Sequence, residues 1–177
     1  MDERTYQPLL DKLYTGRGYQ IKRINGEANR AYDVELIKPE EEKVFKVEEK
    51  GLVKTDALAF EIIQDMKLLA DLTPIDSGYK IHKNCPGNQF TTKAPVQIWI
   101  CGTLASYTVY QVTTKELHDF YKKPEIFKRY PIKPIPQGFG LTICALIPWY
   151  VLEREKIAKK IYETPKVFEP KPIKKAA

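Results

Sequence analysis

The sequence predicts an α/β (α+β) fold, in which a central mixed β-sheet is flanked by helices. Two observations carry this prediction. Apolar residues over 2–14 recur at helical spacing, and a series of later segments reads as strands, the first of which, 19–24, alternates apolar and polar residues. A length of 177 residues and a hydrophobic fraction of 43% suit one domain with a full-sized core. We therefore expect a single domain over 1–163 and a basic, proline-rich tail over 164–177.

The first part of the chain is predicted to be a helix followed by three strands. After the helix over 2–14, strands are expected over 19–24, 32–37 and 44–50. Their connections are short, which implies antiparallel pairing between neighbours. Residues 58–63 form either a fourth strand or the start of a helix.

Strands and helices are mixed in the second part of the chain. We expect, in order, a hairpin of strands 96–101 and 107–112, a helix over 115–121, a basic loop over 122–138, a buried strand over 141–147 and a charged amphipathic helix over 149–163.

Charge and cysteine content narrow the class of protein. The formal net charge is +6, which fits a polyanionic partner but is also common among soluble proteins. Three widely spaced cysteines and two histidines argue against a disulfide framework and against a Cys/His zinc site. The first residues do not resemble a signal peptide, and the longest apolar run, over 141–151, is too short to span a bilayer. We expect a cytoplasmic protein with no membrane partner.

Three side chains on two neighbouring predicted strands form the main candidate site. Side chains alternate between the faces of a strand, so Glu48 and Lys50 share one face and Glu49 lies on the other. Asp33 lies near the start of the preceding strand, and antiparallel pairing places it across from residues 48–50. The sequence therefore predicts that Asp33, Glu48 and Lys50 lie together.

Such an arrangement suits phosphodiester hydrolysis. Two carboxylates from adjacent strands, Asp33 and Glu48, provide the oxygen ligands that Mg²⁺ prefers. A metal ion at this place polarises a phosphate and lowers the pKa of a bound water. Lys50 can orient that water and offset the charge that develops on phosphorus. The alternative is a solvated strand face with cross-strand ion pairs, because Asp, Glu and Lys are common residues.

The order of these elements resembles the PD-(D/E)xK nuclease superfamily, whose fold has a restriction-endonuclease-like core. The segment 55–61 is similar to an element that follows the ExK strand in small phage and bacterial members, and 90–94 is similar to their "TTKA" element. The resemblance covers residues 6–150. It departs from the family pattern where Ala31-Tyr32 replaces the proline before Asp33, where Asp56-Ala57 replaces Gly-Asn and where Pro95 replaces Asp.

The resemblance implies further site residues. Glu61 is expected as an additional ligand or water-holding base, with pairing to a nearby lysine as its alternative. Thr91, Thr92 and Lys93 are expected to bind phosphate, with a helix cap and a solvated lysine as the alternative. The backbone carbonyl of Glu49 is a further expected metal ligand. An acid from the first helix sometimes joins such sites, and Asp11 and Glu3 are both candidates.

A basic loop offers a second place for nucleic acid to bind. Lys128 and Arg129 lie in it among aromatic residues, a mixture that suits phosphate contact and base stacking. The alternative is a solvated loop that its aromatic side chains hold to the core.

Together these features predict a magnesium-dependent nuclease acting on DNA, with Mn²⁺ as a substitute metal. By family resemblance a homodimer is one arrangement that would cut both strands. Two rivals stay open: a nucleic-acid-binding protein without catalysis on the same fold, and a structural or viral accessory protein.

Overall fold

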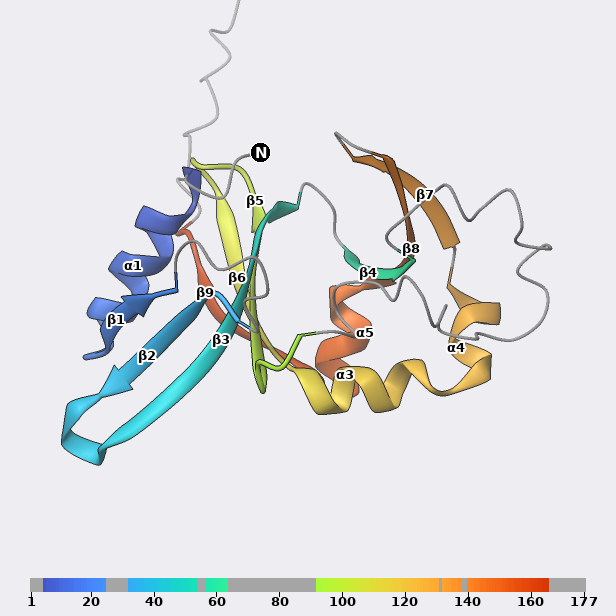
Figure 1. Ribbon diagram of the computed structural model, residues 1–177. Helices are drawn as coiled ribbons and strands as arrows, with labels where there is room; N and C mark the ends of the chain where they lie inside the picture. Colours follow the sequence, from blue (N-terminus) through green and yellow to red (C-terminus); the bar gives the residue numbers. More distant parts are fainter. Residues whose placement is uncertain are drawn as a thin grey trace, which may run out of the picture.

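The computed structural model describes residues 5–24, 32–53, 57–63, 92–130, 132–137 and 140–165. Two sheets are present in this part of the chain (Figure 1). The larger sheet has six strands in the order β1-β2-β3-β5-β6-β9, and the smaller has three in the order β4-β8-β7. Helices flank a mixed sheet, which confirms the predicted α+β architecture, but the second sheet was not predicted.

The N-terminal half of the larger sheet is an antiparallel meander. Its elements are helix α1 (Gln7–Thr15) and strands β1 (Gln20–Arg23), β2 (Val34–Lys38) and β3 (Lys43–Val53). β1 pairs with β2, and β2 pairs with β3 through a single turn of 3-10 helix, Pro39–Glu41. This confirms the predicted helix and the predicted meander.

Strand β5 (Val96–Gly102) makes the sheet mixed. It pairs parallel to β3 and antiparallel to β6 (Tyr107–Thr113), which confirms the predicted hairpin. Helix α3 (Thr114–Tyr121) follows β6 directly. β3 and β5 are therefore neighbours in space although residues 54–95 separate them in the chain.

The predicted helix over 149–163 is wrong in its second half. Helix α5 covers only Trp149–Arg154, and residues Ala158–Glu163 form strand β9 at the edge of the sheet. Lys156 has a positive φ of 59° and ends the helical path. The segment then pairs antiparallel with β6, because an available sheet edge outweighs a charged helical pattern.

The predicted loop over 122–138 is also wrong. It contains helix α4 (Pro124–Arg129) and strand β7 (Ile132–Gln137). Pro134 and Pro136 are tolerated because β7 is an edge strand. Backbone N–H groups two residues apart in a strand point to the same side, so the N–H groups that both prolines lack would lie on one side of β7.

The smaller sheet is built around β8 (Gly140–Pro148). It pairs antiparallel with β7 on one side and with β4 (Ala57–Ile63) on the other. The predicted strand over 141–147 is therefore confirmed, and residues 58–63 are a strand and not the start of a helix.

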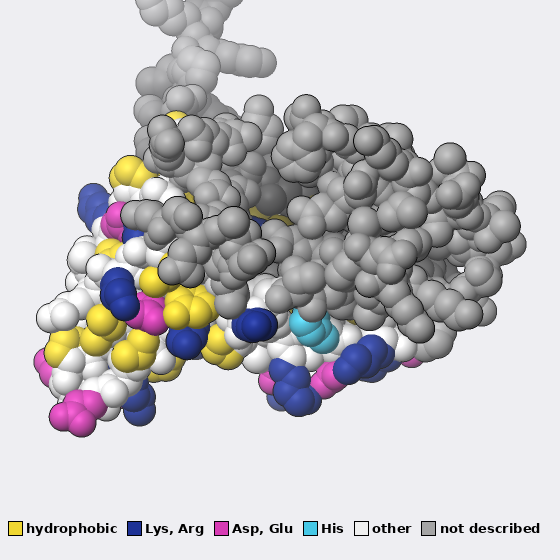
Figure 2. Space-filling view, in the orientation of Figure 1, with side chains coloured by type: hydrophobic (Ala, Val, Ile, Leu, Met, Phe, Trp, Pro, Cys, Tyr) yellow, Lys and Arg dark blue, Asp and Glu magenta, His cyan; other side chains and the backbone are white. Residues whose placement is uncertain are grey.

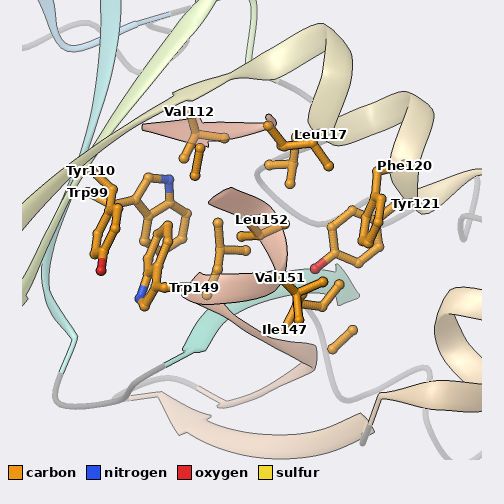
Figure 3. Packing of buried hydrophobic residues seen from close by; sticks show 14 of the residues in the cluster. Trp99, Tyr110, Val112, Leu117, Phe120, Tyr121, Ile147, Trp149, Val151 and Leu152 are labelled. Carbon is orange, nitrogen blue, oxygen red and sulfur yellow. The ribbon is translucent and has the colours of Figure 1, made fainter. Parts of the chain in front are cut away.

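Two apolar cores lie on opposite faces of the larger sheet. Alternate residues of β5 show this directly: Ile98 and Ile100 belong to the core under α1, and Trp99 and Cys101 belong to the core shared with the smaller sheet, α3 and α5. In the second core the rings of Tyr110 and Trp149 stack with centroids 4.2 Å apart (Figure 3).

No helix in the described ranges is both long and apolar enough to cross a membrane. At the end of those ranges, Thr164 still binds the larger sheet, because its backbone N–H donates to the carbonyl of Tyr107 at 2.9 Å. The rest of the predicted tail, from residue 166, lies outside the described residues.

Gly51 tests the packing of α1 and its flanking residues on β3. A Cβ atom at Gly51 would lie 2.1 Å from a ring carbon of the buried Tyr6. We expect Gly51→Ala to lower the free energy of unfolding by about 1–3 kcal/mol, measured by urea denaturation. Gly16→Ala is the control, because Gly16 has a helical φ of −62° and should change stability by less than about 1 kcal/mol. Equal losses in both variants would contradict the proposed clash.

Alkaline pH tests the burial of Tyr121. Burial, with a smaller effect of Cys144, raises the pKa of this hydroxyl well above its ordinary value of 10.0. Above that pH the unfolded chain loses the proton and the folded protein keeps it, so stability falls as pH rises. In Tyr121→Phe the fall in stability between about pH 9 and about pH 11, measured by urea denaturation, should be smaller by about 1.4 kcal/mol in total. Parallel curves for the two proteins would contradict the expectation.

Candidate functional site

Strand β3 directs its side chains to two different environments. Val47 belongs to the core under α1, and Gly51 lies against the ring of Tyr6, so the odd-numbered positions face α1. Glu48 and Lys50 therefore point to the opposite face, where their β5 neighbours in register are Gln97 and Trp99.

The carboxylate of Asp33 binds the backbone of β3. Asp33 lies directly before β2, whose first residue, Val34, pairs with Val47. The backbone N–H of Asp33 donates to the carbonyl of Val47 at 2.9 Å, and Asp33 Oδ2 accepts the backbone N–H of Glu49 at 2.7 Å. The structure thus brings Asp33 against the segment 48–50, as the strand pairing predicted.

Glu48 and Lys50 form an ion pair with each other. Lys50 Nζ lies 2.6 Å from Glu48 Oε1, and both side chains are mostly shielded from solvent. The Glu48 residue is buried, whereas Lys50 is half-buried. Because the pair shares one face of β3, a charged group that approaches this face meets an ammonium and a carboxylate together.

Glu49 is the centre of a buried polar network that the sequence did not predict. Its side chain is 2% exposed, and it accepts hydrogen bonds from Tyr14 at 3.0 Å and from Arg23 at 2.8 Å. Arg23 also pairs with Asp11 of α1. Asp11, one of the two candidate acids of the first helix, therefore binds Arg23 on the α1 face. The other candidate, Glu3, lies outside the described residues.

Burial governs the electrostatics of this network. Burial raises the pKa of the Glu49 carboxyl, and the hydrogen bonds from Arg23 and Tyr14 offset only part of this. Burial also raises the pKa of Tyr14, and the neighbouring Glu49 raises it further. For Arg23, burial lowers the pKa, but hydrogen bonds to Glu49 and Asp11 outweigh it and the net pKa is raised. The guanidinium is therefore charged at all pH values at which the protein is folded.

The candidate donors are oxygen atoms, which hard divalent cations such as Mg²⁺ prefer. Among the described residues, no group of three His, Cys, Asp or Glu side chains is placed to hold a metal ion. Asp33, directly before β2, and Glu48 of β3 are two carboxylates, which is the number that Mg²⁺ takes in many sites. The Glu49 carbonyl is oriented suitably, because N–H and C=O of one strand residue point to the same edge and its N–H reaches Asp33.

The accessory residues are only partly described. Glu61 lies in β4 of the smaller sheet, where it pairs with Cys144, and its side chain is outside the described part. Thr91 is also outside it. Thr92 Oγ1 accepts the backbone N–H of Ala94 at 3.2 Å, and the side chain of Lys93 is exposed. The threonine therefore supports a local turn ahead of β5, and the roles implied for all four residues stay predictions.

Lys128 and Arg129 lie on helix α4 and not in a loop. Arg129 is exposed, and the side chain of Lys128 is outside the described part. Nearby on α3, Asp119 pairs with both Lys115 and Lys122. On the face seen in Figure 2 the described basic side chains are interspersed with acidic ones and form no continuous block.

Comparison of the chain with family models, with curated proteins and with solved structures finds no significant match. The resemblance to the PD-(D/E)xK superfamily therefore rests on the motifs in the sequence, and membership stays a prediction.

Substitution at Asp33 tests its hydrogen bond to the backbone of Glu49. Asp33→Ala removes the acceptor of the Glu49 N–H, so we expect the free energy of unfolding to fall by about 1–3 kcal/mol. Asp33→Asn keeps an oxygen acceptor and should lose less than about 1 kcal/mol. Urea denaturation measures both, and equal losses would show that the hydrogen bond to Glu49 does not support β3.

Proposed function

We propose that this protein is a divalent-metal-dependent nuclease that hydrolyses phosphodiester bonds of DNA. The observation that carries the proposal is the docking of the Asp33 carboxylate on the backbone of Glu49, 2.7 Å from its N–H, beside the Glu48–Lys50 pair. In this proposal the two carboxylates of Asp33 and Glu48, the backbone carbonyl of Glu49 and the ammonium of Lys50 form one site.

Each residue has a distinct role in this proposal. Asp33, Glu48 and the Glu49 carbonyl hold Mg²⁺ or Mn²⁺, which when bound polarises the phosphate and activates a water. Lys50 orients the attacking water and offsets the negative charge that develops on phosphorus. Glu48 keeps the ammonium of Lys50 in place, because the two groups are 2.6 Å apart.

The approach of β5 supports a phosphate contact at Lys93. Val96, the first residue of β5, pairs with Val47, which directly precedes Glu48. The exposed Lys93 lies three residues before Val96, so its segment enters the sheet beside the site. We propose that Lys93, with Thr91 and Thr92, contacts a phosphate next to the scissile one. The net charge of +6 favours a polyanionic substrate.

A second candidate function is binding of nucleic acid without cleavage. The observation that favours it is that the acids around the site already have protein partners: Glu48 pairs with Lys50, and Glu49 pairs with Arg23. Lysine–carboxylate pairs of this kind also occur where no catalysis takes place.

Cleavage assays with matched variants test the proposal. Wild-type protein should cut plasmid or single-stranded DNA with Mg²⁺ or Mn²⁺ and should be inactive with EDTA. Lys50→Met and Asp33→Asn should each lower the rate by about 100-fold or more. Lys46→Met is the control, because Lys46 is exposed on the same face of β3 two residues before Glu48 and should change the rate by less than about threefold.

The other outcomes separate the two candidates. Binding of DNA without cleavage in any metal would favour the second function. Neither binding nor cleavage would exclude both. Circular dichroism of each variant must show that it is folded, because Lys50→Met leaves the buried Glu48 without its ion-pair partner.

A further inference from the structure

The buried network on the α1 face contacts the side chain of Glu49, the same residue whose backbone N–H donates to Asp33. Tyr14 and Arg23 bind the side chain of Glu49, at 3.0 Å and 2.8 Å, and Asp33 binds its backbone N–H at 2.7 Å. Glu49 therefore joins α1 and β1 to the carboxylate of Asp33 through hydrogen bonds. A displacement of Glu49 along β3 would move the acceptor position of Asp33 with it.

Stability alone does not account for the charges in this network. Buried ion pairs are often no more stabilising than well-packed apolar side chains, because desolvation offsets their attraction. Arg23 adds a further cost, because its Nε is buried and has no hydrogen-bond partner in the described structure. The network does fix the orientation of side chains. Arg23 pairs with Asp11 of α1 and with Glu49 of β3, and these charge-assisted hydrogen bonds restrict the conformation of the Glu49 side chain.

The pairing of strand β3 with its neighbours changes near Glu49. Its pairing with β5 is regular up to Lys50, which lies beside Trp99, and then shifts register before Val53. On its other side, β2 begins at Val34, so the Glu49 N–H donates to the side chain of Asp33 and not to a β2 ladder residue. Glu49 thus lies beyond the last residue pair of the β2 ladder, and it is still paired with Ile98 of β5, two residues before the β5 register begins to shift.

We propose that Arg23 is a positioning residue: it clamps the Glu49 carboxylate, and through the Glu49 backbone it fixes the carboxylate of Asp33 beside Glu48 and Lys50. Tyr14 and Asp11 complete the clamp by holding Glu49 and Arg23. The consequence for catalysis rests on the proposed nuclease function, but the clamp itself is a property of the metal-free protein.

Amide hydrogen exchange tests the clamp without any reference to activity. In metal-free Arg23→Met, exchange of the Glu49 amide should rise by about tenfold or more relative to the amides of β5. Arg17→Met is the matched control, because Arg17 also ties the α1 region to the sheet, by donating to the Ile161 carbonyl at 2.6 Å, but it does not contact Glu49. In that variant the ratio of the Glu49 rate to the β5 rates should stay unchanged.

A milder variant covers the case in which Arg23→Met does not fold. Tyr14→Phe removes one hydrogen bond to Glu49 and leaves the charge pair intact, so exchange at Glu49 should rise by about threefold to tenfold relative to β5. An unchanged Glu49 rate in a folded Arg23→Met, or in Tyr14→Phe if Arg23→Met is unfolded, would overturn the proposal.

Metal titration separates this inference from the proposed function. Calorimetric titration with Mn²⁺ should show binding about tenfold weaker in Arg23→Met than in Arg17→Met. Equal Mn²⁺ affinities in the two folded variants would overturn the positioning role. If the wild-type protein binds no Mn²⁺ but Glu49 exchanges faster in Arg23→Met, the clamp is supported and the proposed metal-dependent function fails.

Discussion

Burial of the Glu49 carboxylate is the constraint on which the site region depends. A carboxylate that is 2% exposed must be hydrogen-bonded, and Arg23 and Tyr14 supply its partners from β1 and α1. This requirement ties three elements together on one face of the sheet. At the strand edge, the backbone N–H of the same residue donates to the carboxylate of Asp33. The position of the Asp33 carboxylate therefore depends on how well the face of the sheet under α1 is packed.

The two faces of β3 have different physical tasks. The face under α1 carries Val47 and Glu49 in a closely packed environment, in which an added Cβ at Gly51 would clash with Tyr6. The opposite face carries Glu48 and Lys50 as a shielded ion pair. Strand alternation thus places Glu49 on the packed face and Glu48 and Lys50 on the other, although the three consecutive residues 48–50 are all charged.

Local sequence patterns predicted those parts of the fold that depend on neighbours along the chain. The structure confirms the first helix, the antiparallel meander and the β5–β6 hairpin. These elements were predictable because hydrophobic periodicity and short connections are local signals. The errors at β7 and β9 have a different origin. Segment β7 pairs with an edge of β8, and segment β9 pairs with an edge of β6. The sequence of each segment alone does not show that such an edge is available.

For the site, the sequence by itself determined that Asp33 faces residues 48–50 and that Glu48 and Lys50 share a face, because strand pairing and the period of two follow from local order. It also contained a signal for the network: Glu49 is a charge on the apolar face of its strand, and such a charge requires partners. Only the tertiary structure decided that those partners are Arg23 and Tyr14, and that Asp33 binds the backbone of Glu49. These contacts join residues distant in the chain, and their geometry depends on how α1 packs against the completed sheet.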